Sequence, residues 1–317
     1  MSGIYEIAIL GRATWQLHSL NNEGTVGNVT EPRSVRIIDP NTKKAVTTDG
    51  ISGEMLKHIH TEIMWTLDDK NNLCDACKVL NPEKFNFAIK SKKATPKDVE
   101  DALKQALNTC DICDVQGFLL ERPTASRKST VEFGWALGIP EVYRDIHTHA
   151  RHALGEKGKR EKTEESEEEV GGVSTQMVYH RPTRSGVYAI ISVFQPWRIG
   201  LNEAKQDKYT YDANDNARER RYQLALKAYP LLFARPEGAM TTTRLPHVED
   251  FSGVIVYSTK PIPVPIISPL KSNYVDEVKT IVENIDDSLK VAEFNGIAEF
   301  AMKIGELIKN KPYKMEF

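Results

Sequence analysis

The chain has 317 residues, of which 40% are hydrophobic and 27% are charged, and its formal net charge is −2. This composition predicts a soluble globular protein, and no apolar run is long enough to cross a membrane. Because no secretory signal opens the sequence, we expect a cytoplasmic protein. A nearly neutral chain can bind nucleic acid only through a local basic surface that acidic residues balance elsewhere.

The N-terminal part is predicted to form a long strand at residues 3–20 and shorter strands at 34–38 and 44–48. Ser52 is a candidate N-cap for a helix that extends to about Leu67. The loop before it is rich in Gly and Asn, and such a loop beside a helix N-terminus suits a polyanion. The alternative is an ordinary strand, loop and capped helix. The expected buried side of this helix consists of Met55, Leu56, Ile59 and Ile63.

The middle of the chain is predicted to hold a strand at 85–90, a helix that ends at Asn108, and a second core strand at 115–121. The segment 130–140 is apolar enough to return to the core. The charged run at 155–172 has nothing apolar to bury, so it is predicted to be a mobile surface loop.

The C-terminal part is predicted to contain core strands at 186–194 and 252–257, separated by a helix at 216–233. Two amphipathic helices should follow the Pro-rich stretch 261–269. On the helix at 216–233, we expect inward-facing Tyr222, Ala225, Leu226 and Tyr229, with Arg218 and Arg221 elsewhere on its surface.

Without insertions, the order of elements is strand, helix, strand, strand, helix, strand, as in ferredoxin-like domains and the RNA-recognition motif. We therefore predict an α+β fold in which residues 1–317 form one elaborated domain with C-terminal helices. The insertions at 68–110 and 122–185 should project from opposite ends of one sheet.

All four cysteines fall in two C-x-x-C pairs, Cys74 with Cys77 and Cys110 with Cys113. Each pair can occupy two corners of a tetrahedral site, and four thiolates suit zinc. We therefore predict a structural zinc site that clamps the insertion 68–110. Disulfides and reduced buried thiols are the alternatives.

The sequence contains no nucleophile elbow, Walker loop or H-E-x-x-H motif. His18 or His58 could serve a ribonuclease together with Lys57, but no spacing selects such a pair. His58 and His60 lie two residues apart on a helix and should face apart. A second histidine group, interpreted as surface side chains, consists of His147, His149 and His152.

Basic residues recur in the loops expected at the sheet edge. Each alone is typical of a solvated surface, and they form one surface only if the predicted topology brings them together. They are Arg33, Lys57, Arg122, Arg127, Lys128, Arg181, Arg184, Arg198 and Arg244.

Several short motifs resemble the DevR-type CRISPR-associated autoregulator family, with its archaeal branch the nearest likeness. The resemblance covers nearly the whole chain. This family supplies the repeated backbone subunit of type I Cascade complexes. The motifs are Ser19-Leu-Asn, Gly27-Asn, Ile51-Ser-Gly-Glu-Met-Leu-Lys-His58, Cys113-Asp-Val-Gln-Gly-Phe-Leu119, Arg198-Ile-Gly200, Pro236-Glu-Gly-Ala239 and Arg244-Leu-Pro246.

The resemblance implies a modified RNA-recognition-motif palm with finger and thumb insertions. It also implies copies that stack into a filament on CRISPR RNA, join other Cascade subunits and present the guide to target DNA. By motif, the implied RNA contacts of the palm are Asn21, Asn28, Arg33, Ser52, Gly53, Lys57 and His58, with Gly238 and Arg244 in a second loop.

Related backbone subunits of type III complexes cleave target RNA with an aspartate in the loop after the first strand. Here that loop, residues 19–33, contains Glu23 and Glu31 but no aspartate. This difference argues for RNA binding without catalysis. The alternative function is a RAMP-type endoribonuclease that processes the CRISPR transcript.

Overall fold

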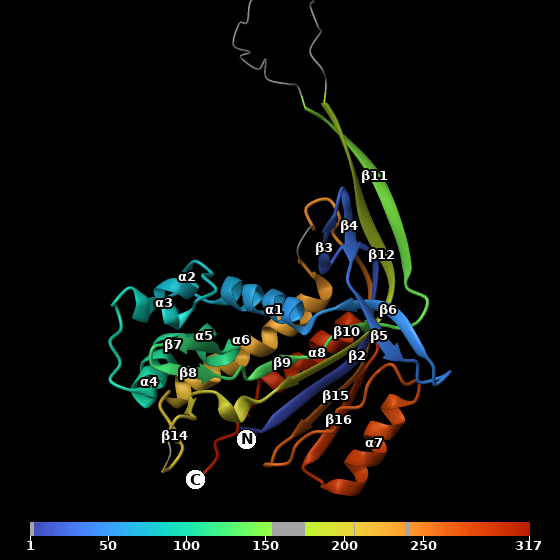
Figure 1. Ribbon diagram of the computed structural model, residues 1–317. Helices are drawn as coiled ribbons and strands as arrows, with labels where there is room; N and C mark the ends of the chain where they lie inside the picture. Colours follow the sequence, from blue (N-terminus) through green and yellow to red (C-terminus); the bar gives the residue numbers. More distant parts are fainter. Residues whose placement is uncertain (1–2, 154–174, 206, 239–240) are drawn as a thin grey trace, which may run out of the picture.

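A computed structural model describes residues 3–153, 175–205, 207–238 and 241–317. The segment 155–172, predicted to be a mobile loop, lies outside the described residues. None of the described helices combines the length and the apolar composition that a bilayer crossing requires. Figure 1 shows a twisted sheet, helices packed against it, and a long two-stranded ribbon that rises from one end.

The centre of the protein is an 11-stranded sheet. Its main path contains, in spatial order, β16 (Leu289–Phe294), β15 (His247–Ser258), β2 (Glu6–His18), β12 (Thr175–Phe194), β10 (Ala136–Gly138), β6 (Ala45–Ile51) and β5 (Ser34–Ile38). Neighbours on this path are antiparallel. Together with the helices, this sheet confirms the predicted α+β class. The sequence did not predict β16.

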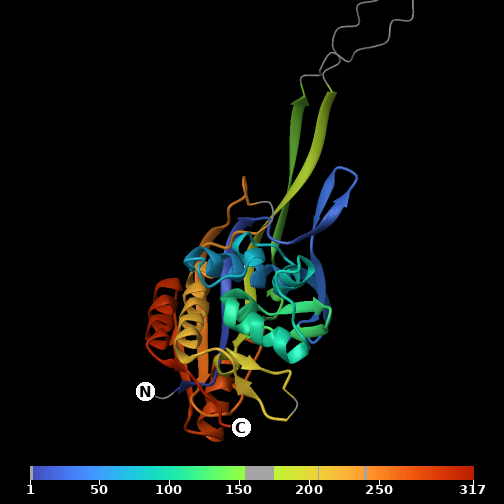
Figure 2. The same ribbon diagram turned by 90° about the vertical axis from the view of Figure 1, so that its left-hand side faces the viewer.

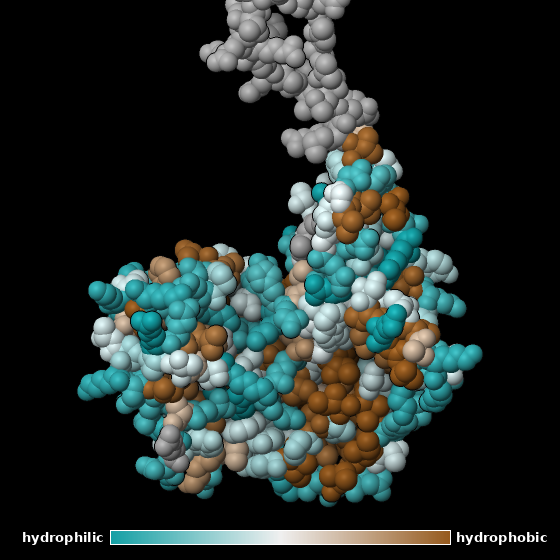
Figure 3. Space-filling view, in the orientation of Figure 1, coloured by the Kyte–Doolittle hydropathy of each residue, from teal (hydrophilic) through white to brown (hydrophobic). Residues whose placement is uncertain are grey.

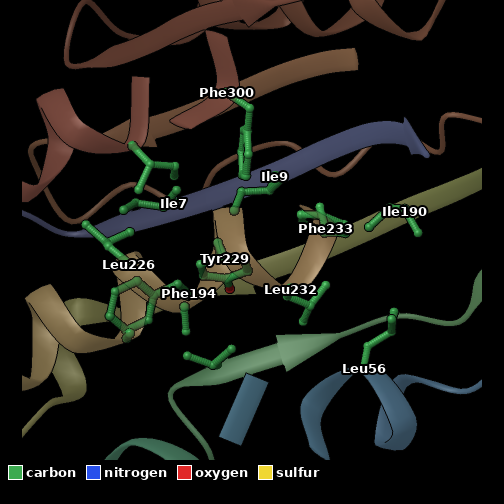
Figure 4. Packing of buried hydrophobic residues seen from close by; sticks show 14 of the residues in the cluster. Ile7, Ile9, Leu56, Ile190, Phe194, Leu226, Tyr229, Leu232, Phe233 and Phe300 are labelled. Atoms are coloured by element: carbon green, nitrogen blue, oxygen red, sulfur yellow. The ribbon is translucent and has the colours of Figure 1, made fainter. Parts of the chain in front are cut away.

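Both faces of the sheet are covered by helices, namely α1 (Gly53–Leu67), α6 (Asp215–Ala234), α7 (Tyr274–Ile285) and α8 (Ile297–Ile308). On β2, Ile7 and Ile9 pack with α1, α6 and α8 in the main core (Figure 4), whereas Ala8 and Leu10 pack in a second core with α7. Since side chains alternate across a strand, this burial on two faces explains why β2 is apolar at each position from Ile7 to Leu10.

Helix α1 begins where the sequence predicts. The hydroxyl of its N-cap Ser52 accepts a hydrogen bond from the Met55 amide at 3.3 Å. On the side expected to be buried, Met55 and Ile63 are only partly buried, whereas His60 lies in the core. His58 is exposed, so the two histidines face apart as predicted.

Helix α6 buries Tyr222 and Tyr229 as predicted. The expectation that Arg218 and Arg221 lie on its surface is wrong, because each residue is only 2% exposed. Each guanidinium finds acceptors inside the protein, which for Arg218 include the Ile199 carbonyl at 2.8 Å. A charged residue in a helical pattern is therefore not a sufficient sign of exposure when buried acceptors surround it.

The ribbon is formed by β11 (Tyr143–Ala153), which pairs with the first part of β12 along its whole length. A smaller hairpin of β3 (Asn22–Val26) and β4 (Val29–Pro32) lies beside it, and Val29 pairs with His180 of β12. Figures 1 and 2 show both hairpins projecting from the same end of the sheet. Apolar side chains are exposed along the ribbon (Figure 3), Ile146 among them.

The cysteine-bearing insertion packs around a small core of its own. It contains α2 (Asp75–Lys78), α3 (Phe85–Lys90), α4 (Val99–Thr109) and α5 (Asp111–Gln116), followed by β7 (Phe118–Glu121) and β8 (Thr124–Arg127). A helix between the two cysteine pairs was predicted and is confirmed by α4.

Two strand predictions for this region are wrong. Residues 85–90 form helix α3, since a short apolar run fits a buried helix as well as a buried strand. Residues 115–121 are divided between α5 and β7, and β7 pairs with β8 outside the large sheet. The place beside β12 is taken by β9 (Val131–Phe133) and β10, so the expected return of 130–140 to the core is confirmed.

Smaller elements connect the ends of the chain to the body of the protein. The N-terminal β1 (Gly3–Ile4) pairs in parallel with the C-terminal β17 (Lys311–Pro312). After β12 the chain forms the short 3-10 helix η1 (Pro196–Arg198), and β13 (Leu201–Asn202) then pairs with β14 (Thr210–Tyr211). These segments lead into α6.

Candidate nucleic-acid interface and metal centre

The four cysteines meet in one buried cluster, and their Sγ atoms all lie within 4.8 Å of one another. The Sγ of Cys113 is 3.8 Å from that of Cys74 and 3.6 Å from that of Cys77. These distances exceed the S–S bond of about 2.05 Å in a disulfide. They match the edge of about 3.8 Å that a tetrahedron with Zn–S bonds of about 2.3 Å would have. The cluster could therefore hold a metal ion.

Short helices position the ligands. Cys74 is the N-cap of α2, and Cys110 ends α4 and begins α5. The Sγ of Cys110 accepts a hydrogen bond from the Cys113 amide at 3.4 Å. Hydrogen bonds from Cys110 and the other thiols hold the pKa of Cys74 well below its usual range. Hydrogen bonding to Cys110 instead raises the pKa of Cys77, and burial raises the pKa of Cys113. The thiolate, which is the form that binds metal, is therefore favoured at Cys74.

Helix α5 carries two carboxylates that bind arginines of α6. Asp111 accepts hydrogen bonds from Arg220 and Arg221, each at 2.7 Å. Asp114 accepts from Arg221 and Arg127, also at 2.7 Å. Both carboxylates are fully buried. One face of α5 thus supplies thiols to the cluster, while the other is fixed to α6 by charge-assisted hydrogen bonds.

Three arginines expected at the RNA surface are instead buried. Arg127 pairs with Asp114 and Glu203, and Arg198 pairs with Glu203 at 2.6 Å. Arg184 binds both oxygens of Asp49 at 3.0 Å. Because these guanidinium groups are saturated inside the protein, we correct their expected role from RNA contact to fold stabilisation. The other two cations of this part of the chain, Arg122 and Lys128, are exposed.

The loop after β2 is fastened to the start of α1. Asn21 has a positive φ of 53°, and its side-chain oxygen accepts a hydrogen bond from the Ser52 amide at 2.6 Å. A Cβ on Gly53 would lie 2.2 Å from the Phe133 carbonyl oxygen, so only glycine fits there. Gly238 approaches the same region, since a Cβ there would lie 3.0 Å from the Met55 sulfur.

The cations of this region have different partners. The Arg33 guanidinium lies over the Trp135 ring at 5.6 Å and is 3.8 Å from Glu23. Lys57 faces the insertion and lines a cavity of about 300 Å³ together with Lys84. Burial, and secondarily the charge of Lys84, lowers the pKa of Lys57 to about 8.

His58, the neighbour of Lys57, is exposed and forms an ion pair with Glu62 at 3.1 Å when protonated. Lys57 and Met55 are two residues apart on α1, so Lys57 points away from the side on which Met55 meets Gly238. The structure therefore brings Gly238 to one side of α1 and Lys57 to another.

A stack of rings and cations lies in the outer half of the ribbon, beside the β3–β4 hairpin. The Arg181 guanidinium lies over the Tyr179 ring at 5.2 Å, and Tyr179 stacks on His149 with ring centroids 5.3 Å apart. The Nη2 atom of Arg244 is 3.2 Å from the Nε2 atom of His149. Asn28 donates a hydrogen bond to the backbone of the same ribbon at Val178, at 3.0 Å.

Three of the expected site residues, Asn28, Arg181 and Arg244, thus meet on one surface. Sequence reasoning missed His149 and Tyr179 as parts of it. They come from two strands that lie 30 positions apart but are paired directly opposite each other. Without the register of β11 against β12, no local pattern shows that these two rings stack.

The sequence profile of the family described as "CRISPR-associated negative auto-regulator DevR/Csa2" matches residues 9–279. In fold, the chain is similar to a chain of a "CRISPR RNA-guided surveillance complex, pre-nicking", with a TM-score of 0.46 and 10% identity over 96% of this chain and 99% of that one. It is also similar to Thermofilum pendens Csc2, with a TM-score of 0.42 and 11% identity over 98% of this chain and 87% of that one. Among curated proteins, no sequence matches. Because the profile covers most of its length, the chain belongs to the CRISPR-associated DevR/Csa2 family.

Proposed function

We propose that this protein is the CRISPR RNA-binding backbone subunit of a type I Cascade surveillance complex in the cytoplasm. Copies would polymerise along the guide, join other subunits and present the guide to target DNA. The observation that carries this proposal is the family match over residues 9–279. We propose no catalytic role, since the loop at 19–33 has no aspartate to cleave RNA.

We also propose that the palm is a ferredoxin-like, RNA-recognition-motif core. The strand order β15-β2-β12-β9, with α1 after β2 and α6 after β12, supports this assignment. The insertion at 68–110 would then be the finger. The thumb would be the ribbon of β11 and β12, while the rest of the insertion at 122–185 contains β9 and β10 of the core.

The surface in the outer half of the ribbon supports RNA binding of a particular kind. Arg181 lies over the Tyr179 ring and Arg244 contacts a ring nitrogen of His149, and single-stranded nucleic acids bind to such combinations of cations and aromatic rings. A guide-binding subunit must accept any spacer, so we expect contacts to phosphate and ring faces rather than to base edges. Asn28 lies on the same surface, whereas Arg33, Lys57 and His58 are proposed as separate contacts to the guide.

The roles of Asn21, Ser52, Gly53 and Gly238 are proposed to be indirect. Asn21 and Ser52 bond to each other and cap α1, while the two glycines permit close approach of neighbouring segments. They would shape the RNA-facing loops, but their side chains would not contact the RNA. This separates residues that position the surface from residues that touch the guide.

We propose that the cysteine cluster holds a structural zinc ion. Four buried thiols at tetrahedral spacing, with no cysteine left over, support zinc over other metals. Zinc bound by Cys74, Cys77, Cys110 and Cys113 would connect both ends of the insertion. Its binding energy would then stabilise that part of the fold.

The test of the function is to incubate purified protein with labelled guides of unrelated sequence and with complementary target strands. The scaffold proposal predicts intact RNA, similar affinity for each guide, and assemblies that dissociate as salt rises. Scission of the RNA that a His58→Ala or Lys57→Ala change abolishes would instead support the endoribonuclease alternative. His18 is a poor candidate for that chemistry, because burial lowers its pKa well below the usual range.

A further inference from the structure

One lysine of the insertion has an unusual position that the proposed RNA surface does not explain. Lys84 precedes α3 with φ 51° and ψ −132°, a backbone conformation that residues other than glycine rarely adopt. Its side chain turns inward, and its ammonium donates hydrogen bonds to the carbonyl oxygens of Gly117 at 2.5 Å and Gln116 at 3.3 Å. A solvated surface lysine would need neither this backbone nor these partners.

The surroundings of Lys84 point to the cysteine cluster. Lys84 lines the same cavity as Cys77. Burial lowers the pKa of Lys84, and the charges of all four cysteines oppose that shift. Among the residues that the structure describes, no carboxylate forms an ion pair with Lys84. The carbonyl groups it binds close the C-terminal end of α5, the helix that carries Cys113. Lys84 thus connects the end of a ligand-bearing helix to the charge of the cluster.

The position of Lys84 matters because a zinc ion bound by four thiolates is negatively charged. A divalent zinc ion with four thiolates has a net charge of −2. Burying such a charge is costly unless a cation lies close to it. We propose that Lys84 is a positioning residue of the metal centre, which balances part of this charge and fixes the helix that carries Cys113. This inference rests on the zinc centre proposed above.

The same cavity could be interpreted as a phosphate site, because Lys57 and Lys84 both line it. One observation argues against that role for Lys84, because its ammonium already donates hydrogen bonds to two carbonyl groups. The phosphate contact proposed for Lys57 is separate, since Lys57 lies on α1. We therefore assign the positive charge of Lys84 to balancing the negative charge of the thiolate cluster.

The experiment separates the charge of Lys84 from its hydrogen bonds. Lys84→Arg keeps both, Lys84→Gln keeps a donor without the charge, and Lys84→Met removes both. Full-length variants are loaded with zinc, and the affinity is measured by competition with a chromophoric chelator. We expect the Gln and Met variants to bind zinc about 10- to 100-fold more weakly, as is typical when a partner of a metal ligand is lost. The Arg variant should stay close to wild type.

Lys90→Met is the matched control, because Lys90 lies in the same insertion but is exposed and pairs with Glu83 and Glu121. Cobalt loading gives a second readout, in which the thiolate-to-metal absorption reports ligand geometry. If the wild type binds no metal, the zinc centre is overturned and this inference with it. If the wild type binds zinc and Lys84→Gln binds it equally well, the inference alone is overturned. Should Lys84→Met fail to fold, Lys84→Gln decides.

Discussion

The carboxylate of Asp114 lies 2.7 Å from the guanidinium of Arg221, and the pair joins the insertion to the central helix α6. Both side chains are buried, with exposures of 0% and 2%. Asp114 directly follows Cys113, so neighbouring residues of α5 face two different centres. One short helix, α5, therefore connects the cysteine cluster to the contact between the insertion and α6.

The first prediction follows from this pair. Asp114→Ala should lower the free energy of unfolding by about 3–5 kcal/mol, because each of two buried arginines would lose one of its two carboxylates, leaving Arg127 with Glu203 alone and Arg221 with Asp111 alone. Urea unfolding followed by circular dichroism measures the change. The control is Asp75→Ala, which removes an exposed ion pair with Lys93 and should cost far less stability, since water screens such a pair. Equal effects of the two changes would contradict the proposed importance of the buried network.

The sequence predicted those parts of the fold that local patterns determine. The strand before residue 20, the N-cap at Ser52 and the cysteine cluster all depend on neighbouring residues or on a fixed spacing, and the structure contains them. The error at 115–121 arose because an apolar run shows burial but not the partner that buries it. Residues 118–121 in fact pair with β8 in a separate two-stranded sheet.

In the candidate site, too, local patterns predict some features and tertiary contacts decide the others. Arg127 and Arg198 are basic residues in loops, and nothing local distinguishes them from Arg244. Their burial depends on Asp114 and Glu203, which lie 13 and 5 positions away and reach them only in the folded chain. Residue type could thus predict a basic surface, but only the tertiary contacts decide which cations remain available to it.

The second prediction concerns metal removal. Chelation, or Cys113→Ser, should increase hydrogen exchange of the amides of α2 and α5 because their ends are fixed by the thiolate cluster. The amides of β2 and β15 should keep their protection, since these strands belong to the main sheet. Exchange that is unchanged in α5 after complete metal removal would show that the arginine contacts alone hold this helix.

The third prediction is a pH dependence of stability that arises from His60. Burial lowers the pKa of His60 to about 4, so the unfolded chain binds a proton more readily than the folded one. The resulting stabilisation is complete above the ordinary pKa of 6.5 and is lost as the pH falls toward 4. Lowering the pKa of His60 from 6.5 to about 4 corresponds to about 3 kcal/mol in the free energy of unfolding.

Urea unfolding between pH 4 and 7 measures this effect, and His60→Gln should flatten the curve. The neutral ring fits its site, where the amide of Gln116 lies 2.8 Å from Nδ1 and the Ala225 carbonyl lies 3.0 Å from Nε2. His58→Gln is the control because His58 is exposed. A flattened curve in the His58 variant, with none in the His60 variant, would contradict the assignment.

The fourth prediction is a pH dependence of RNA affinity that arises from Lys57. With its pKa lowered to about 8, Lys57 is charged at pH 7 and largely neutral at pH 9. Guide affinity should therefore fall as the pH rises through 8, by at most about tenfold for each further pH unit. Lys57→Arg should remove this dependence because a guanidinium stays charged. A pH profile that is the same in both proteins would exclude Lys57 as a phosphate contact.

The last prediction separates charge from stacking in the outer half of the ribbon. Arg244→Ala should weaken guide binding for every sequence and lower the dependence of log affinity on log salt by about 0.7, because one phosphate contact is lost. Tyr179→Ala should leave that slope unchanged and still cost about 1–3 kcal/mol, because a ring that can stack on a base is removed. Tyr209→Ala is the control, since Tyr209 is exposed but packs against Phe317 near the C-terminus. If Tyr179→Ala changed the slope as Arg244→Ala does, its effect would be to displace Arg181, whose guanidinium lies over the ring, and the stack would serve to hold a cation rather than a base.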